Sequence, residues 1–249
     1  IPCKEVISNI GVQNTFEKLL SPIEKKYCRV AFDNVPPAVA HFCLYVGLDV
    51  SSEALQLPKH NIWWYIDEDI DAIINTSTAK TAPENFAYIS FPSAKDPQWE
   101  IDHPNTATIQ AITMADYDWF KAYEDQPWRN RDEVYKQIKK DFETAMLSKL
   151  YTLFPQIKGH VQVTEVSTPL STKHFSNYQK GEIYGLAHSP ERFNLPFLRP
   201  KTKIKGLRLV GQDITVVGVA GAMLSGMLCA TTVLKFKSWN NFKEMNSYK

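Results

Sequence analysis

The clearest hydrophobic pattern in the chain predicts one long amphipathic helix over residues 131–154. Apolar side chains recur there at three- and four-residue steps, and lysines take much of the remaining circumference. Asn130 is a candidate N-cap with Glu133 three residues later, and Pro155 closes the segment. Such a stripe is typical of a helix that packs on a core. Its apolar positions are Val134, Ile138, Phe142, Ala145, Met146, Leu150 and Leu153.

A second pattern, short runs rich in β-branched and aromatic residues, predicts several strands. The runs stop at proline or turn residues, and most follow one another without a helical segment between them. Strands in that order favour a largely antiparallel sheet. The predicted strands are residues 4–10, 28–32, 41–48, 61–66, 86–91, 107–114 and 160–166, with a short last one at 207–210.

Composition excludes several classes of protein. Of the 249 residues, 44% are hydrophobic and 22% are charged, which is the balance of a folded globular chain. The net charge is +1 and no basic run with interleaved aromatics occurs, so nucleic acid is not a predicted partner. The four cysteines form no C-x-x-C pair and no two of the six histidines stand at i, i+4. We therefore predict buried, reduced thiols and no metal site.

The stretch after residue 204 carries the candidate chemistry. A short strand leads to Gly211-Gln212-Asp213 and then to a helix whose first turn, from Gly218, is glycine and alanine. A helix start exposes unpaired N–H groups and a positive dipole end, and glycine lets a ligand approach the backbone closely.

Two other interpretations of this helix stay open. One is a tightly packed helix without a ligand, and the other is a membrane span, because residues 214–234 carry no charge. Of those 21 residues, 11 are Gly, Ala, Ser, Thr or Cys, which is weak hydropathy for a span. The pattern favours a helix of a soluble domain.

The run Gly206-Leu-Arg-Leu-Val-Gly-Gln-Asp213, followed by Gly218-Val-Ala-Gly-Ala222, resembles the C-terminal flavin-contacting motif of the carotenoid desaturase, carotenoid isomerase and retinol saturase group. Residues 6–9, 88–97, 167–170 and 181–185 resemble further segments of the same group in the same order, closest to the retinol saturase branch. No G-x-G-x-x-G occurs in the chain, although family members carry that fingerprint near their N-terminus. The resemblance therefore implies that the N-terminal dinucleotide-binding half lies outside this sequence, removed by cleavage, on a longer protein or on a partner chain.

The resemblance also implies a fold class and a domain arrangement. The fold is α/β: part of a Rossmann-like FAD-binding domain joined to an α+β substrate domain built on an antiparallel sheet. Residues 1–12 are then a strand returning to the FAD domain, residues 13–170 the substrate-binding domain, and residues 171–249 the C-terminal part of the FAD-binding domain.

The implied activity is FAD-dependent hydride transfer to or from a carbon–carbon double bond of an apolar retinoid- or carotenoid-like lipid. Carried over by position, Gly211, Gln212 and Asp213 would lie beside the ribityl–pyrophosphate part of FAD. Gly218 and Val219 would offer backbone N–H groups to the pyrimidine end of the isoalloxazine. Tyr184 is the one catalytic candidate, as a proton donor or as a wall of the site. Besides the lipid and the missing half, the resemblance implies a cytoplasmic or membrane-peripheral location with peripheral membrane contact.

Two other functions remain. One is a different flavin oxidase of the same architecture, of the amine oxidase type, for which an aromatic cage beside the flavin would be the sign. The other is a non-catalytic fragment that binds a lipid or a partner protein. Aromatic residues are candidates for a lipid tunnel or, more commonly, for plain core. They are Trp63, Trp64, Tyr65, Phe86, Tyr88, Phe91, Trp119 and Phe120.

Overall fold

The computed structural model describes residues 2–32, 35–77 and 85–234. The chain divides into two compact units, one made of residues 1–38 with 176–249 and the other of residues 39–175. The sequence places these boundaries at 12/13 and 170/171. The first boundary lies later because Val12, Phe16 and Cys28 pack in one core cluster with Leu186 and Leu209. We refer to the two parts as unit 1 and unit 2.

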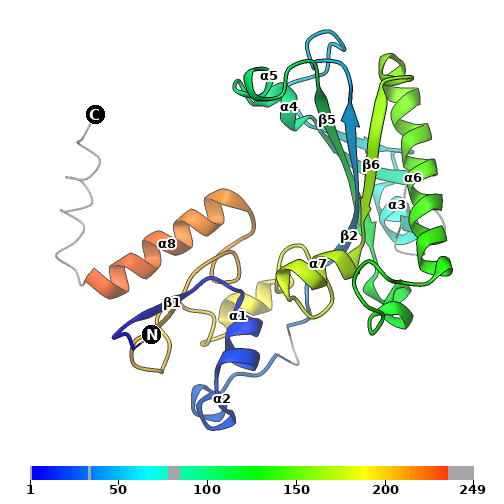
Figure 1. Ribbon diagram of the computed structural model, residues 1–249. Helices are drawn as coiled ribbons and strands as arrows, with labels where there is room; N and C mark the ends of the chain where they lie inside the picture. Colours follow the sequence, from blue (N-terminus) through cyan, green and yellow to red (C-terminus); the bar gives the residue numbers. More distant parts are fainter. Residues whose placement is uncertain (1, 33–34, 78–84, 235–249) are drawn as a thin grey trace, which may run out of the picture. The chain divides into compact units, whose positions relative to one another are not determined.

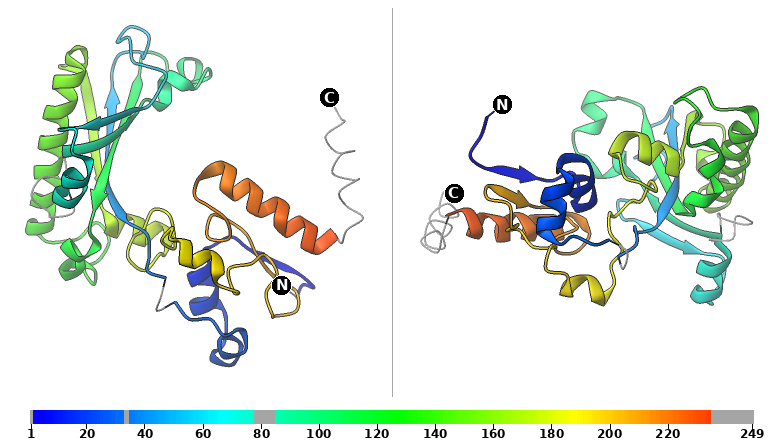
Figure 2. Two further views of the ribbon diagram at one scale, coloured as in Figure 1. Left: turned by 180° about the vertical axis from the view of Figure 1, so that it is seen from behind. Right: turned by 90° about the horizontal axis from the view of Figure 1, so that it is seen from below.

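Unit 2 is built on a five-stranded sheet in the order β3-β4-β5-β2-β6, and every neighbouring pair is antiparallel. The predicted antiparallel sheet is therefore confirmed. The long helix α6 runs along one face of this sheet (Figures 1 and 2). The strands are β2 (Ala40–Leu48), β3 (Ile62–Tyr65), β4 (Phe86–Ser90), β5 (Ala107–Ala115) and β6 (Val161–Ser167).

Alternate residues of the strands face the two sides of the sheet. Phe42, Leu44 and Val46 of β2 belong to the main core, as do Ile109 and Ala111 of β5. The residues between them point to the opposite face, because side chains alternate along a strand. The core face is the one that α6 covers.

Helix α6 (Glu133–Leu153) confirms the predicted helix, with two corrections at its start. The N-cap is Asp132 and not Asn130, since the Asp132 carboxylate accepts the backbone N–H of Tyr135 at 2.9 Å. Val134, predicted on the buried stripe, is 61% exposed, and Tyr135 is buried in its place. The helix ends at the predicted point, before Pro155.

Shorter elements complete unit 2. The remaining helices are α3 (Ile70–Ser77), α4 (Pro92–Lys95), α5 (Trp99–Asp102) and α7 (Pro169–Ser176), with 3₁₀ turns at Tyr117–Trp119, Lys121–Tyr123 and Pro155–Ile157.

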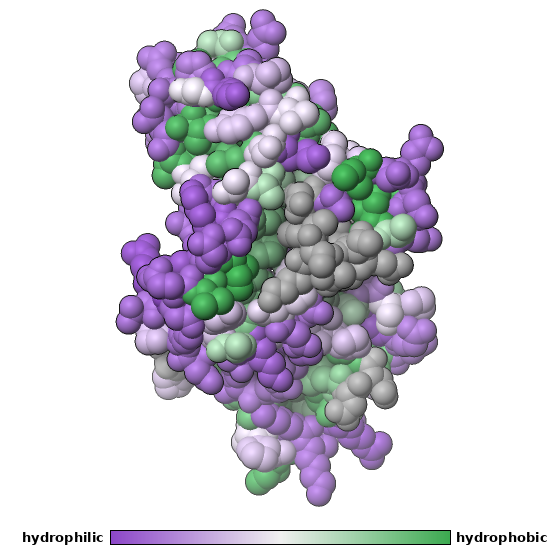
Figure 3. Space-filling model, turned by 90° about the vertical axis from the view of Figure 1, so that its right-hand side faces the viewer, coloured by the Kyte–Doolittle hydropathy of each residue, from purple (hydrophilic) through white to green (hydrophobic). Residues whose placement is uncertain are grey.

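In the face shown in Figure 3, hydrophilic side chains predominate and apolar ones gather in small separate patches.

Unit 1 holds both ends of the described chain. Strand β1 (Val6–Ser8) pairs in parallel with β7 (Leu207–Leu209), which confirms that these distant segments share one body. The strand predicted at 28–32 is wrong: α2 (Pro22–Cys28) ends there, started by a capping box between Ser21 and Glu24. The other elements are α1 (Val12–Asn14), the short π-helix Thr15–Leu19, the 3₁₀ turn Pro190–Asn194 and α8 (Gly218–Leu234).

Within the described ranges, no helix combines the length and the apolar character needed to cross a bilayer. Helix α8 buries only Gly221, Ser225 and Cys229, which stand four residues apart on one face. All four cysteines are free, but Cys3 is exposed, so the prediction of buried thiols is wrong at that position.

Candidate functional site

A pocket of about 400 Å³ in unit 1 brings together the five residues predicted to bind a cofactor. They come from the turn after β7 and from the first turn of α8, and residues from the start of the chain close the other side. Gly211, Gln212, Asp213, Gly218 and Val219 share the lining with Asn9, Gly11, Tyr178, Val210 and Ala222.

The first turn of α8 presents bare backbone to this pocket. Gly218 has a φ of 90°, in the left-handed region that favours glycine, and a Cβ built on it would meet nothing within 4 Å. Val219 beside it is 80% exposed. Gly221 differs, since a Cβ there would lie 1.9 Å from the carbonyl oxygen of Val216. Gly221 is thus required by packing inside unit 1, whereas Gly218 leaves open space.

Gly211 forms the turn that separates β7 from the rest of the site. Its φ is 105°, and an added Cβ would lie 2.5 Å from Oδ1 of Asn9. Its backbone N–H donates to Oγ of Ser225 in α8 at 2.8 Å. A side chain at this position would therefore disturb the turn, the Asn9 contact and the helix together.

Asp213 is 3% exposed and its carboxylate is engaged by backbone. Oδ2 accepts the N–H of Val12 and Oδ1 accepts that of Leu186, both at 2.9 Å. A Cβ on Gly185 would lie 2.2 Å from Oδ1, so that glycine makes room for the carboxylate. Through these contacts Asp213 holds the backbone at Val12 and Leu186 in place beside the pocket.

Arg192 is a residue of this site that sequence reasoning missed. It is 1% exposed, and its Nη2 donates to the carbonyl oxygens of Gln212, Asp213 and Thr215 at 3.0, 2.7 and 3.2 Å. The guanidinium thereby holds the loop that leads into α8. A single arginine in a proline-rich loop has no periodic or motif signal in the sequence.

Two tyrosines have different positions. Tyr184, the predicted catalytic candidate, is 41% exposed and does not line this pocket, whereas Tyr178 does. Burial, and then the nearby charge of Asp213, raise the pKa of the Tyr178 phenol. Glu182 is 1% exposed, and burial raises the pKa of its carboxyl as well. The pocket therefore has a protonated phenol in its wall and a buried acid close by in sequence.

The pocket has features that suit one end of a flavin. It offers open space at a helix start, N–H groups without helical partners and the exposed apolar side chain of Val219. It has no glycine fingerprint for a pyrophosphate, because the sequence contains none. The residues fit the isoalloxazine end better than a whole dinucleotide.

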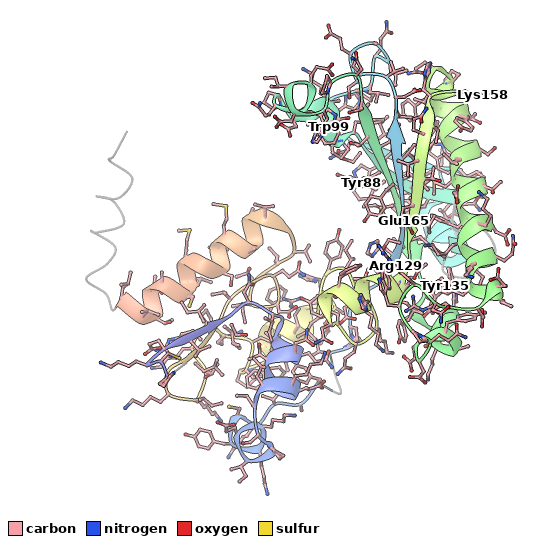
Figure 4. All side chains as sticks on the ribbon, in the orientation of Figure 1. Tyr88, Trp99, Arg129, Tyr135, Lys158 and Glu165 are labelled. Carbon is pink, nitrogen blue, oxygen red and sulfur yellow. The ribbon has the colours of Figure 1, made fainter. Side chains whose placement is uncertain are left out.

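The aromatic candidates in unit 2 separate into two sets. Phe91 and Phe120 are fully buried in the main core, and Trp64 and Trp119 pack against it. The others lie on the opposite face of the sheet, where Tyr88 and Trp63 contact each other with ring centroids 4.9 Å apart (Figure 4 labels Tyr88). That second set is Trp63, Tyr65, Phe86 and Tyr88.

Comparison with known proteins agrees with the resemblance in the sequence. No family model matches the chain. The all-trans-retinol 13,14-reductase of rat is 30% identical over 258 residues, which cover 99% of this chain and 42% of the rat protein. The human protein of that name is 30% identical over 257 residues, covering 99% of this chain and 42% of its own length. The chain is homologous to part of an all-trans-retinol 13,14-reductase.

The match to the all-trans-retinol 13,14-reductases covers only part of their length and includes a relative named as inactive. The chain spans about two fifths of the length of these relatives. A zebrafish protein named an inactive all-trans-retinol 13,14-reductase is also 30% identical, over 94% of this chain. The predicted relationship to the retinol saturase branch is confirmed. The relatives include both proteins named as reductases and one named as inactive, so sequence similarity does not distinguish the two.

Proposed function

We propose that this chain is the part of an FAD-dependent oxidoreductase that holds the isoalloxazine end of the flavin and faces a retinoid-like polyene. The observation that carries the proposal is that five residues from the flavin-contacting motif line one pocket at the start of α8. The homology to all-trans-retinol 13,14-reductases supports a retinoid double bond as the reacting group.

The residues of unit 1 would divide the work as follows. The backbone N–H groups of Gly218 and Val219 would donate to the flavin's pyrimidine end, where the helix dipole favours negative charge. When bound, FAD supplies the hydride chemistry that protein side chains lack. Arg192 and Asp213 are positioning residues, because they hold the turn that carries Gln212.

Saturation of a double bond also needs a proton. Tyr178 is the stronger candidate donor, because its phenol lines the pocket and, with a pKa raised above the ordinary 10, is protonated at neutral pH. Tyr184 stays a candidate on the resemblance alone. Replacing each by phenylalanine separates them: Tyr178→Phe should lower kcat with the flavin retained, and Tyr184→Phe should leave kcat near the wild-type value.

The face of the unit 2 sheet opposite α6 is the candidate contact for the lipid. Trp63 and Tyr88 offer flat apolar surface there, and aromatic walls suit a conjugated chain. The same proposal includes a dinucleotide-binding half that carries G-x-G-x-x-G and a peripheral contact with a membrane.

A non-catalytic lipid- or partner-binding role is the second candidate, favoured by the inactive zebrafish relative. The two functions differ in colour and in activity. A flavoenzyme is yellow and reduces retinol, whereas a protein that only binds a lipid or a partner is colourless and inactive. Purified full-length protein without flavin absorbance would favour the binding role.

The decisive experiment places valine at two glycines of α8 in the full-length protein. A Cβ at Gly218 and a Cβ at Gly226 both meet open space, but only Gly218 lies in the pocket and has a positive φ. Gly218→Val should lose flavin absorbance and retinol reduction with the far-ultraviolet circular dichroism unchanged. Gly226→Val should keep both. Full flavin occupancy and normal turnover in Gly218→Val would show that the flavin lies elsewhere.

A further inference from the structure

Unit 2 carries a second pocket, of about 500 Å³, beside the edge strand β6. In Figure 4, Arg129 precedes α6, Tyr135 lies in its first turns and Glu165 lies on β6, while Lys158 marks the far end of the helix. The pocket is built wholly from residues of this unit. Its lining is Tyr45, Trp128, Arg129, Arg131, Tyr135, Lys136, Lys139, Glu165, Val166, Ser167, Ser171 and Phe175.

The charge of this lining is unbalanced. Four cations and one carboxylate line the pocket, an excess of three positive charges. Lys139 pairs with Glu165 at 2.5 Å, and Lys136 pairs with Glu133, which lies outside the lining, at 2.6 Å. Among the described residues, neither Arg129 nor Arg131 has a carboxylate within 4.0 Å. Two guanidinium groups are thus free to take an external anion.

Arg131 is the more telling of the two arginines, because it is only 8% exposed. Its Nε donates to the carbonyl oxygen of Tyr123 at 3.3 Å, and its guanidinium carbon lies 4.9 Å from the ring centroid of Tyr135 and 5.7 Å from that of Trp128. Burying a cation is costly, and ring faces compensate only part of the cost. A bound anion would add a charged partner to the hydrogen bond and the ring contacts that this guanidinium already makes.

Arg129 has an unusual backbone for a residue with a side chain. Its φ is 63°, in the left-handed region that costs free energy outside glycine. Strained residues of this kind cluster at ligand sites. Arg129 is exposed, so the protein does not use it to stabilise a core.

We propose that this pocket binds the anionic head of an amphipathic molecule, a carboxylate or phosphate on an apolar body. The planar guanidinium groups of Arg129 and Arg131 match the oxygens of such a head. Tyr45 and Phe175, 41% and 75% exposed, offer apolar surface for the body. The volume is that of a small-ligand site and exceeds what a lone ion needs. The proposal stands on unit 2 alone and does not depend on the flavin site.

The test uses the 249-residue chain and parinaric acid, a polyene carboxylate whose fluorescence rises on binding. Arg129→Gln should weaken binding by about tenfold, the effect of losing one hydrogen bond between charged groups. Lys158→Gln removes the same charge at the far end of α6 and should change the affinity by less than about twofold. Arg129→Lys keeps the charge and should lie between wild type and Arg129→Gln. The alcohol analogue should bind at least about tenfold more weakly than the acid.

Two sources of the anionic head are separated by competition. Phosphatidylcholine vesicles that contain phosphatidylserine should displace parinaric acid if a membrane headgroup is the natural ligand, and decanoate alone should do so if a free amphiphile is. Either result supports the site, provided that Arg129→Gln removes the competition. Equal effects of Arg129→Gln and Lys158→Gln, equal binding of acid and alcohol, or no saturable binding of the acid would overturn the proposal.

Discussion

Oδ2 of Asp213 accepts the backbone N–H of Val12 at 2.9 Å, although 201 positions separate the two residues in the sequence. The other carboxylate oxygen accepts the N–H of Leu186 at the same distance. One buried side chain thereby joins the start of α1, the loop before the 3₁₀ turn at 190–194 and the turn that leads to α8. The pocket at α8 depends on three segments that only tertiary contacts bring together.

Replacing Asp213 by asparagine should destabilise unit 1. The amide can accept only one of the two backbone N–H groups and turns its own donor toward the other, so a buried donor loses its partner. We expect a loss of about 3 kcal/mol in the free energy of unfolding, measured by urea denaturation. Asp116→Asn is the control, because Asp116 is exposed and accepts one N–H, from Asp118. Equal losses in both variants would contradict the buried clamp.

Arg192→Lys should loosen the loop that carries Gln212. Lysine keeps the charge but lacks the planar fork that reaches several carbonyl oxygens at once. We expect a loss of about 2 kcal/mol or more in unfolding free energy, and weaker flavin retention in the full-length protein. Arg199→Lys changes an exposed arginine that also donates to backbone carbonyls and should have little effect. Unchanged stability in Arg192→Lys would show that the carbonyl contacts are dispensable.

Glu182 should give unit 1 a stability that falls as the pH rises. Burial raises the pKa of its carboxyl above the ordinary 4.5, and the charge of Asp213 acts in the same direction. The folded state therefore holds this proton more tightly than the unfolded state. Its stabilising contribution is complete below the unfolded pKa and is lost as the pH passes the folded pKa.

Glu182→Gln isolates this effect from the other carboxyl groups. The unfolding free energy of wild type minus that of Glu182→Gln should decrease from about pH 4 upward, with at most about 1.4 kcal/mol lost for each pH unit. The measurement is urea denaturation at a series of pH values. A difference that stays flat or rises with pH would mean that the carboxyl is charged in the folded protein at no cost.

Helix α6 shows how much of the fold was predictable. Periodicity located the body of the helix and its end before Pro155, because apolar spacing reports the helix directly. It misplaced the first turn, where Tyr135 is buried and Val134 is not. The Tyr135 hydroxyl contacts Oγ1 of Thr168 at 2.8 Å, a partner 33 residues away. Hydrophobicity alone ranks valine above tyrosine and cannot register such a contact.

That the candidate residues at α8 lie together in one pocket was predictable for a different reason. Its glycines stand close together in sequence and mark a turn and a helix start, and the resemblance to the flavin-contacting motif named Gly211 and Gly218. Asn9, Gly11 and Tyr178 reach the same pocket from far along the chain. The participation of Asn9 and Gly11 depends on the β1–β7 pairing register, and that of Tyr178 on the packing of its ring against Gly11, neither of which a local pattern encodes.

Phe142→Ala should destabilise unit 2 strongly. The ring of Phe142 stacks on that of Phe42, with centroids 4.2 Å apart and planes 14° apart, and both residues are buried. Removing it leaves a cavity between α6 and β2, with an expected loss of about 4 kcal/mol. Val134→Ala in the same helix should cost about 0.5 kcal/mol or less, since Val134 is 61% exposed. Similar losses for Phe142→Ala and Val134→Ala, measured by thermal unfolding, would show that the buried face of α6 has been assigned incorrectly.

The chain alone should bind FAD no better than it binds FMN. Its pocket of about 400 Å³ offers a helix start for the isoalloxazine end, and the sequence has no G-x-G-x-x-G to hold the pyrophosphate. The adenosine half of FAD would then add no contact, and the two dissociation constants should agree within about threefold, a difference under 1 kcal/mol. Titration of the 249-residue chain, followed by quenching of flavin fluorescence, measures both. Gly218→Val should weaken both ligands equally. A submicromolar constant for FAD with a clear preference over FMN would mean that this chain carries a pyrophosphate site of its own.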